Sequence, residues 1–328
     1  MQQSHKTAFL YHPFFLMHNT GKRHPENSLR LKHLYRYIAN SPLVSENLVT
    51  MIKPNPEKKY EYILLTHSEQ YLDIFKLYCK RGYRYFDHAD NVISFRTYDV
   101  ALFHAYSCIY AADLIMKDHF DKVFIAGRPP SHHAGKDYCL GFCFINNVAA
   151  TANYLISNWG IKNVLIIDID AHHGNGTQDI FYDRKDVFYF SIHEHPSFIF
   201  PGTGRYFETG VNDGLNYTLN CPVMPDVKDD EYRQLFLKSC EKIFSYFKPD
   251  IILVSAGYDT HANDKISDLS LSQNCISDII SIINNYAASY CNNKIIFFLE
   301  GGYQINTLCE CVYNTLDIIS KGVSYVRF

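Results

Sequence analysis

The sequence predicts an α/β fold built on a mostly parallel sheet. Five segments share one pattern, in which a run of β-branched or aromatic residues is followed by polar residues with Gly or Pro. They are KVFIAGRPPSHH from Lys122, NVLIIDIDAHH from Asn163, VFYFSIHEH from Val187, DIILVSAGYDTH from Asp250 and KIIFFLEGGY from Lys294. Helix-like stretches lie between several of them, for example over residues 147–157 and 230–247, and a further helix is expected from Thr97. Near-continuous apolar strands that alternate with helices indicate a parallel sheet.

Each of these five strands ends in residues that can do chemistry. In chain order the candidates are His132 and His133; Asp168, Asp170 and His172; Ser191 and His193; Asp259 and His261; and Glu300 and Tyr303. Ligands of open α/β sheets bind outside the carboxyl ends of the strands. Because parallel strands bring those ends to one edge, the sequence predicts one site there.

The segment NVLIIDIDAHHGNGTQ, residues 163–178, is the most informative of the five. The apolar run from Val164 to Ile167 leads directly into two carboxylates and two imidazoles, and the chain is expected to leave the strand near Ala171. Ionised carboxylates are costly to bury unless they are paired or bind a metal. Side chains two apart in an extended chain share a face, so Asp170 and His172 supply half of a zinc site.

Composition favours a soluble enzyme. The 328 residues are 47% hydrophobic and 20% charged, and the absence of a linker or repeat predicts a single domain over residues 1–328. A net charge of −3 offers no footprint for direct nucleic-acid binding. No apolar stretch approaches the roughly 20 residues that span a bilayer, and the N-terminus lacks the features of a signal peptide. We therefore expect a cytoplasmic protein with no membrane partner.

The ten cysteines are expected to be reduced thiols. Two pairs, Cys139 with Cys143 and Cys309 with Cys311, can be interpreted as a second metal or redox site. Neither pair has the CxxC spacing of such sites, which favours small buried hydrophobic side chains.

The motifs RPPSHHA, GFCFINN, DIDAHHGNGTQ, PGTG, SAGYDTH and EGGY occur here in the order typical of the zinc-dependent histone deacetylase family. The chain resembles the class II-like and bacterial members, together with the related acetylpolyamine amidohydrolases. The resemblance runs from Arg23 to Tyr303. It implies one arginase/deacetylase-like α/β domain with an eight-stranded, mostly parallel sheet, and hydrolysis of N-acetyl amides to acetate and a free amine.

The resemblance also implies the metal sites. Asp170, His172 and Asp259 look like the zinc ligands, and three protein ligands leave one position open for water, as in catalytic zinc sites. Asp168 and Ser191, with backbone carbonyls around His172, resemble an inner site for a monovalent cation, K⁺ in most relatives.

Catalytic roles follow by the same resemblance. His133 is the expected general base, oriented by Asn175, and His132 is its electrostatic support, paired with Asp168. Such a base needs its far nitrogen held by a hydrogen bond, which fixes its tautomer. Tyr303 is the expected donor to the developing oxyanion.

Further residues are expected to contact the substrate. Phe142 and Phe200 match the walls of a tunnel for an aliphatic stem, Gly141 keeps one wall thin, and Gly302 with Gly301 allows the bend that aims the tyrosine. Asp90, with Asp87 as competitor, matches a rim aspartate, and Ile266 falls on the rim. Arg30 matches a basic residue near the acetate-release pocket, which Ser131, in place of the usual glycine, is expected to narrow.

Four functions are weighed on these grounds. The leading hypothesis is deacetylation of acetyl-lysine side chains in proteins or peptides, and the nearest rival is acetylpolyamine hydrolysis, which needs acidic rim residues. A catalytically silent metal-binding scaffold would have lost a ligand, base or donor, and an arginase-like enzyme would carry more Asp in place of the tandem histidines. The sequence gives no oligomeric state.

Overall fold

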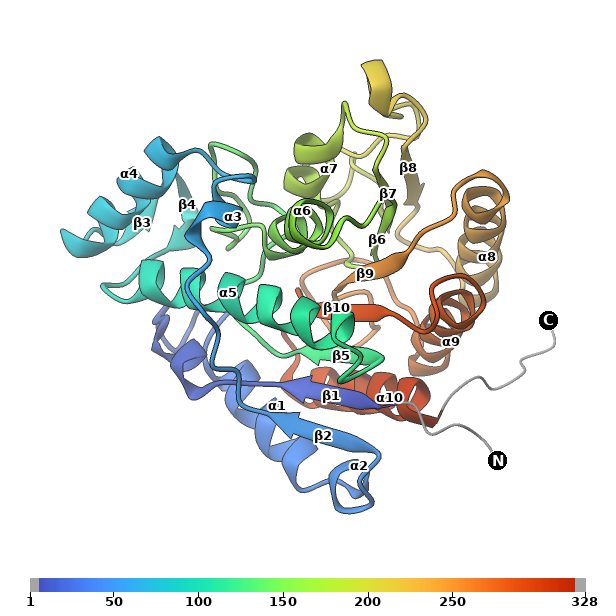
Figure 1. Ribbon diagram of the computed structural model, residues 1–328, viewed down its shortest axis with the longest axis horizontal. Helices are drawn as coiled ribbons and strands as arrows, with labels where there is room; N and C mark the ends of the chain where they lie inside the picture. The colour runs from blue at the N-terminus through green and yellow to red at the C-terminus, as the bar shows by residue number, and fades with distance from the viewer. Residues whose placement is uncertain (1–5, 322–328) are drawn as a thin grey trace.

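A computed structural model describes residues 6–321 of the chain; the ends of the predicted domain, residues 1–5 and 322–328, lie outside the described residues. Its centre is one eight-stranded sheet with the order β2-β1-β5-β10-β9-β6-β7-β8 (Figure 1). The strands are β1 (Thr7–Leu10), β2 (Val49–Ile52), β5 (Lys122–Ile125), β6 (Val164–Asp168), β7 (Val187–Glu194), β8 (Thr218–Val223), β9 (Ile251–Ala256) and β10 (Ile295–Leu299). All seven neighbouring pairs are parallel, which confirms the predicted fold class.

Helices cover both faces of the sheet. One face packs against α1 (Leu29–Ala39), α8 (Asp229–Tyr246), α9 (Gln273–Tyr290) and α10 (Ile305–Lys321). The other packs against α4 (Glu69–Lys80), α5 (Thr97–Met116) and α6 (Asn147–Trp159), with α7 (Asn175–Phe181) beside β7. The remaining elements are the short helices α2 (Pro42–Ser45), α3 (Tyr60–Ile63), η1 (Pro13–Met17) and η2 (Asn212–Gly214), and a hairpin of β3 (Tyr85–Phe86) with β4 (His88–Val92).

The five strands predicted from sequence are adjacent in the sheet, in the order β5-β10-β9-β6-β7, and β1 lies next to β5. Strands β5, β10, β9 and β6 are buried along their whole length, which explains their near-continuous apolar sequences. Strand β6 ends at Asp168, earlier than the expected position near Ala171, because the Asp168 carboxylate accepts the Asp170 backbone N–H and starts a turn. This early turn brings Asp170 and His172 to the edge of the sheet.

Local sequence signals explain the helix ends. The Asn146 side chain caps α6 by accepting the backbone N–H of Ala149, and Gly160, with φ of 67°, ends it in a left-handed conformation. Helix α8 has three acidic residues in its first turn, which suits the positive end of the helix dipole. Both predicted helices therefore occur, within one or two residues of their expected bounds.

One helix corrects an expectation. Over Thr97–Met116, α5 is 20 residues long and, by length and composition, apolar enough to span a membrane, whereas the sequence analysis found no such stretch. Two thirds of its apolar window (67%) is buried inside the fold, between the sheet and the neighbouring helices. The burial explains the composition as that of a core helix.

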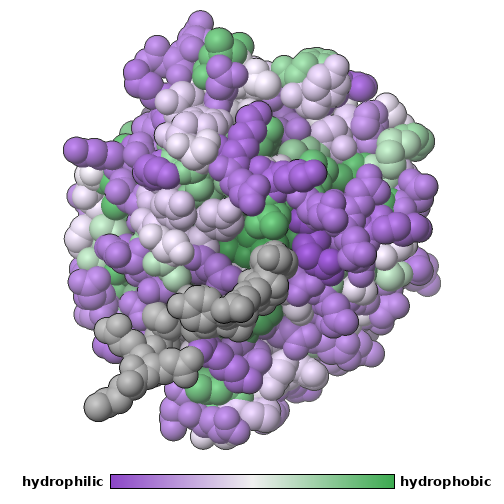
Figure 2. Space-filling view, turned by 90° about the vertical axis from the view of Figure 1, so that its right-hand side faces the viewer, coloured by the Kyte–Doolittle hydropathy of each residue, from purple (hydrophilic) through white to green (hydrophobic). Residues whose placement is uncertain are grey.

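The outer surface differs from this interior. Figure 2 shows the face on the right-hand side of Figure 1, where α8 and α9 lie; hydrophilic residues cover most of it, and apolar residues gather in a smaller central area.

Candidate active site

The carboxyl ends of β5, β6, β9 and β10 meet at one edge of the sheet, and a cavity of about 450 Å³ opens there. Strand β4 and the loops after β5, β7 and β9 complete its walls. Its lining residues are Asp90, His132, His133, Gly141, Phe142, His172, Phe198, Ile199, Phe200, Ile266 and Tyr303. The predicted convergence of strand ends on one site is therefore found in the fold.

Three side chains at the floor of this cavity form a candidate metal centre. One possible ligand atom from each of Asp170, His172 and Asp259 lies within 4.8 Å of the others. His172 Nδ1 is 3.0 Å from Asp170 Oδ1 and 3.1 Å from Asp259 Oδ2. The three residues are buried, and they come from the turn after β6 and from the end of β9.

The electrostatics of this group call for a cation. Burial and the negative charge of Asp170 raise the pKa of Asp259 to about 6. Asp259 Oδ2 is buried, and it makes no well-aligned hydrogen bond among the described residues although His172 Nδ1 lies 3.1 Å away. A divalent cation would relieve the repulsion between the two carboxylates and give that oxygen a partner. Two carboxylates and one imidazole are also a ligand set that suits such an ion.

Glycines let the backbone come close to these carboxylates. A Cβ atom on Gly301 would lie 2.3 Å from Asp259 Oδ2, and its N–H donates to Asp170 Oδ2 at 2.8 Å. A Cβ atom on Gly257 would lie 2.1 Å from Asp170 Oδ2. Any side chain at either position would push the carboxylates apart, so both positions require glycine.

The tandem histidines lie beside the candidate metal centre in two different environments. His132 Nδ1 donates to Asp168 Oδ2 at 3.0 Å, and His133 Nδ1 faces Asn175 Oδ1 at 2.8 Å. Burial alone would lower the pKa of His132, but the charges of Asp168 and Asp170 raise it to about 10. Burial and the neighbouring imidazoles of His132 and His172 lower the pKa of His133 well below its usual value. His133 is therefore the neutral imidazole of the pair.

Asp168 accepts hydrogen bonds from three groups of the site. Besides His132 it accepts the Asp170 backbone N–H and, at 3.1 Å, the Tyr189 hydroxyl. Ser191 is its register partner in β7, but the Ser191 hydroxyl pairs with His193 Nδ1 at 2.7 Å. His193 and His261, which also end predicted strands, do not line the cavity.

Tyr303 enters the cavity from the loop after β10. Its backbone N–H donates to Asp264 Oδ2 at 2.5 Å, and the Arg30 guanidinium lies 4.8 Å from its ring centre. Arg30 also donates to the carbonyl oxygens of Glu300 and Gly302, so it fixes the backbone on both sides of Gly301. Burial raises the pKa of Tyr303 well above its usual value, which keeps the phenol protonated as a hydrogen-bond donor.

Two aromatic side chains form walls of the cavity. Phe142 and Phe200 both line it, and the Phe200 ring lies edge-on to His133 with 5.1 Å between ring centres. A Cβ atom on Gly141 would lie 2.3 Å from His133 Cδ2, so this wall can approach the histidine only with glycine. Phe142 has φ of 70°, an unfavourable backbone conformation for an aromatic residue, and its N–H donates to Asn91 Oδ1.

The rim consists of partly exposed side chains from strand β4 and from the loop after β9. Asp90 and Ile266 line the opening, and His88 Nδ1 lies 2.6 Å from Asp90 Oδ1. Asp87 is turned away, because its carboxylate accepts the Cys139 backbone N–H at 2.9 Å. Of the two candidate rim aspartates, the geometry therefore favours Asp90.

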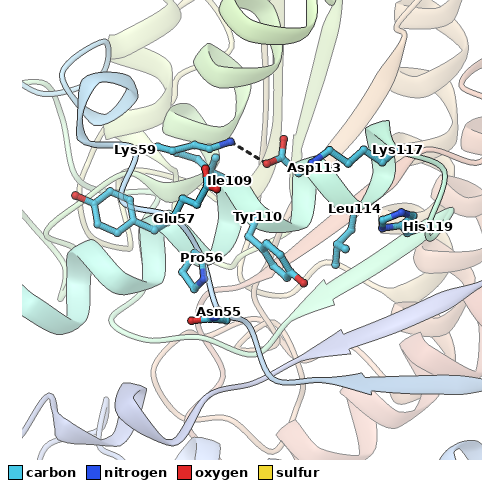
Figure 3. A pocket seen from close by; sticks show the side chains of 11 residues that line it. Asn55, Pro56, Glu57, Lys59, Ile109, Tyr110, Asp113, Leu114, Lys117 and His119 are labelled. Atoms are coloured by element: carbon cyan, nitrogen blue, oxygen red, sulfur yellow. Dashed lines mark hydrogen bonds and ion pairs between the residues drawn. The ribbon is translucent and has the colours of Figure 1, made fainter.

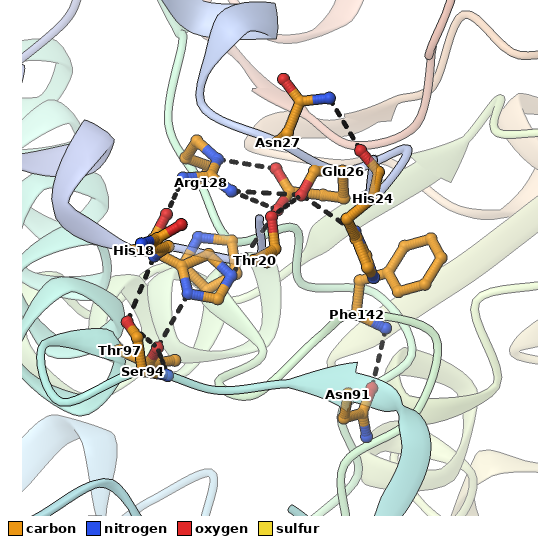
Figure 4. A network of polar contacts seen from close by, with 12 residues as sticks. His18, Thr20, His24, Glu26, Asn27, Asn91, Ser94, Thr97, Arg128 and Phe142 are labelled. Atoms are coloured by element: carbon orange, nitrogen blue, oxygen red, sulfur yellow. Dashed lines mark hydrogen bonds and ion pairs between the residues drawn. The ribbon is translucent and has the colours of Figure 1, made fainter. Parts of the chain in front are cut away.

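A buried polar network supports this rim from behind. Figure 4 shows the Arg128 guanidinium bound to the Glu26 carboxylate, with His24 between this pair and Phe142. The His24 ring is edge-on to Phe142 with 4.7 Å between ring centres. The segment before α1 thereby contacts the cavity wall.

Comparison with known proteins identifies the family to which this site belongs. The model of the histone deacetylase domain matches residues 24–319, which is most of the chain. The chain belongs to the histone deacetylase family. It is thus an amidohydrolase of the deacetylase type, and the resemblance noted in the sequence is confirmed.

Relatives of this deacetylase span nearly its whole length. A probable deacetylase of Archaeoglobus fulgidus is 31% identical over 325 residues, which cover 97% of this chain and 87% of the relative. The acetoin utilization protein AcuC of Staphylococcus aureus is 34% identical over 313 residues, or 93% of this chain and 79% of the relative. The crystal structure of the HDA15 HD domain matches with a TM-score of 0.89 and 28% identity, covering 98% of this chain and 89% of that one.

Sequence reasoning gave no role to Glu300, which helps to organise this deacetylase site. Both oxygens of Glu300 are engaged by Ser131, one by its hydroxyl and the other by its backbone N–H. The Ser131 hydroxyl, which was expected to narrow an acetate pocket, thus binds a neighbouring strand end. Glu300, His132 and Cys143 can also reach a single ion, but Ser131 already satisfies the Glu300 carboxylate. The only sequence signal for Glu300 was its position at a strand end.

The cysteines of the deacetylase are not disulfide-bonded. All ten are free and buried, including the two pairs singled out in the sequence. Burial raises the pKa of Cys139 well above its usual value and that of Cys309 to about 11, so both thiols are poorly reactive. This agrees with the interpretation as small buried side chains.

A second hollow, of about 250 Å³, lies between α5 and the segment that follows β2 (Figure 3). It contains none of the predicted site residues. Lys59 and Asp113 form a 2.8 Å ion pair inside it, and Lys59 also donates to the Tyr154 hydroxyl. The charges of Lys59 and Asp113 are thus paired with each other inside the hollow.

Proposed function

We propose that the protein hydrolyses the acetyl amide of acetyl-lysine side chains in proteins or peptides, with zinc as its cofactor. The observation that carries the proposal is the cavity between Phe142 and Phe200. It leads from a rim with one lining carboxylate to three potential metal ligands that lie beside His133 and Tyr303. An aliphatic stem would fit between the two rings, and the amide would reach the floor.

Asp170, His172 and Asp259 are the proposed zinc ligands. Their mixed nitrogen and oxygen donors suit zinc, and three protein ligands leave a coordination position open. When bound, zinc would polarise the amide carbonyl and lower the pKa of a water molecule. For the inner site of Asp168 and Ser191, a monovalent cation such as K⁺ remains our proposal.

His133 is the proposed general base. Its Nδ1 is engaged by Asn175, so Nε2 is free to take a proton from the attacking water. The same nitrogen then returns the proton to the leaving amine. His132, held by Asp168, carries positive charge that favours the developing negative charge nearby.

Tyr303 is the proposed oxyanion donor. Its hydroxyl would donate to the carbonyl oxygen as negative charge builds there, an interaction that is stronger in the transition state than in the bound substrate. Arg30 holds the peptide groups around Gly301 and stacks on the phenol ring. The phenol is thus set in place before the substrate arrives.

The rim favours acetyl-lysine over an acetylated polyamine. Phe198 and Ile266 are exposed apolar side chains at the opening, whereas Asp90 is the one carboxylate among the described lining residues. A polyamine carries further positive charges that need acidic partners, while a peptide needs apolar contact and an acceptor for its backbone N–H groups. Asp90 itself can bind either, and it is the reason for keeping acetylpolyamine hydrolysis as the second candidate.

A side-by-side kinetic assay tests this choice. The zinc-loaded protein is given an acetyl-lysine peptide, N-acetylputrescine and N8-acetylspermidine. We expect kcat/KM to be higher for the peptide by about tenfold or more, equivalent to about 1.4 kcal/mol of transition-state binding. A preference for either polyamine would reject the lysine assignment and support the second candidate.

We further propose that residues 1–328 form one domain and that the protein works in the cytoplasm.

A further inference from the structure

The amide of Asn175 is held at both ends. Its Oδ1 lies 2.8 Å from His133 Nδ1, and its Nδ2 donates to the Tyr138 hydroxyl oxygen at 3.0 Å. The Tyr138 hydroxyl in turn donates to Asp179 Oδ2 at 2.5 Å. A continuous chain of hydrogen bonds therefore runs from the exposed Asp179 to the proposed general base.

The order of donors in this chain is determined from its outer end. An ionised carboxylate can only accept, so the Tyr138 proton must point toward Asp179. The Tyr138 oxygen is then left as an acceptor, and the Asn175 NH₂ group must face it. Asn175 consequently presents its oxygen to His133, which places the histidine proton on Nδ1 and leaves the lone pair on Nε2.

We propose that Tyr138 and Asp179 are positioning residues that select, through the orientation of the Asn175 amide, the His133 tautomer able to act as a base. This inference rests on the proposed role of His133. An amide can turn over and offer NH₂ instead of oxygen, and His133 would then carry its proton on Nε2 and could not accept one. A carboxylate at position 175 would offer only acceptors and would need no such support.

The local fold holds the three residues in line. Asn175 and Asp179 are four residues apart on α7, so they share one face of the helix. The Tyr138 ring lies directly over Gly135, where a Cβ atom would come within 2.2 Å of the ring. The Thr177 backbone N–H donates to the His132 carbonyl at 3.1 Å, which docks α7 onto the loop of tandem histidines.

The test compares two variants in two backgrounds of the zinc-loaded protein. In the native background, Tyr138→Phe keeps the ring over Gly135 and should lower kcat by roughly tenfold, the lower end for a supporting partner of a functional histidine. Asp179→Ala, at an exposed position, should lower kcat in the same direction. KM should change less than about twofold in both, since neither residue lines the cavity. In the Asn175→Asp background, neither substitution should change kcat by more than about twofold. Tyr138 and Asp179 act on His133 only through the Asn175 amide, so their effects should disappear once that amide is replaced.

Asp183→Ala is the matched control, because it removes a carboxylate four residues further along the chain that has no hydrogen bond or ion pair among the described side chains. It should leave kcat unchanged. Equal losses for Tyr138→Phe in both backgrounds, or no loss in the native one, would overturn the proposal.

Nitrogen-15 NMR of labelled histidines gives a readout that is independent of activity. The His133 signal is identified by its absence in His133→Ala. It should report a proton on Nδ1 in the native protein and in Asn175→Asp, and a shift toward Nε2–H in Tyr138→Phe. An unchanged tautomer in Tyr138→Phe would reject the inference even if Asn175→Asp has no activity. Since His133→Ala tests the base by itself, failure of this inference is distinguishable from failure of the proposed function.

Discussion

The floor and the rim of the cavity are built differently. Floor residues such as Asp170, 1% exposed, follow the ends of central strands and have several hydrogen-bond partners. Rim residues such as Ile266 and Phe198, 40% and 56% exposed, stand on loops. Displacing a buried carboxylate costs several hydrogen bonds, whereas replacing an exposed apolar side chain costs little. We infer from this contrast that the sheet fixes the chemistry, whereas the more exposed residues around the opening set the choice of substrate.

This comparison predicts that floor variants lose kcat and that rim variants change KM. Asp259→Ala should have the largest effect. It leaves two of the three proposed ligands, and two ligands hold zinc weakly, so both bound zinc and measurable hydrolysis should be lost. Metal analysis of the purified protein together with a peptide assay checks this. Asp268→Ala, a nearby exposed carboxylate, is the control, and full zinc with full activity in Asp259→Ala would show that the floor is wrongly assigned.

His133→Ala should lower kcat by at least about 10²-fold, the scale of general-base catalysis, while the protein keeps its zinc. Steady-state kinetics and metal analysis on the same preparation measure both quantities. His33→Ala, on the outer side of α1, serves as the control. A near-normal kcat would move the role of base elsewhere, most plausibly to His132.

Tyr303→Phe removes only a hydroxyl group and should lower kcat by roughly 10²- to 10³-fold. KM should change little, because the hydrogen bond strengthens as charge builds on the oxygen. Tyr290→Phe, at a half-exposed position on α9, controls for loss of a phenol elsewhere. A raised KM with unchanged kcat would show that Tyr303 binds the substrate in the ground state and does not stabilise the oxyanion.

Asp90→Asn should have the smallest effect of the four substitutions. We expect KM for an acetyl-lysine peptide to rise about tenfold, as for the loss of one charge-assisted hydrogen bond, with kcat within about twofold. Asp73→Asn on α4 is the control. A loss confined to kcat would group Asp90 with the buried catalytic residues and would contradict the separation between residues that set kcat and residues that set KM.

The same division explains what could be predicted from sequence. The strand ends of β5, β6, β9 and β10 were predictable because apolar runs that finish in His, Asp or Glu have no packing explanation. Phe142 and Asp90 needed a family resemblance, since an aromatic residue in a loop or an aspartate in the short strand β4 carries no periodic signal.

Residues that act through another side chain were missed for a different reason. Tyr138 lies 37 positions from Asn175, and their hydrogen bond exists only once α7 has docked on the loop of tandem histidines. The spacing of Asn175 and Asp179 places them on one helix face, but nothing local links them to a tyrosine in another loop. Glu300 was noticed only for its place after β10, and its bonds to Ser131 depend on the pairing of β10 with β5.

Zinc titration of the metal-free protein tests whether hydrolysis depends on one zinc ion at the proposed site. Protein stripped by a chelator should not hydrolyse an acetyl-lysine peptide, and activity should return in proportion to added zinc up to about one equivalent per chain, the count expected for a single three-ligand site. A hydroxamate, which chelates through two oxygens, should then inhibit the restored enzyme. Full activity in the metal-free protein would show that hydrolysis does not need zinc. Recovery of activity by zinc in a variant that lacks Asp170, His172 or Asp259 would show that these residues do not bind it.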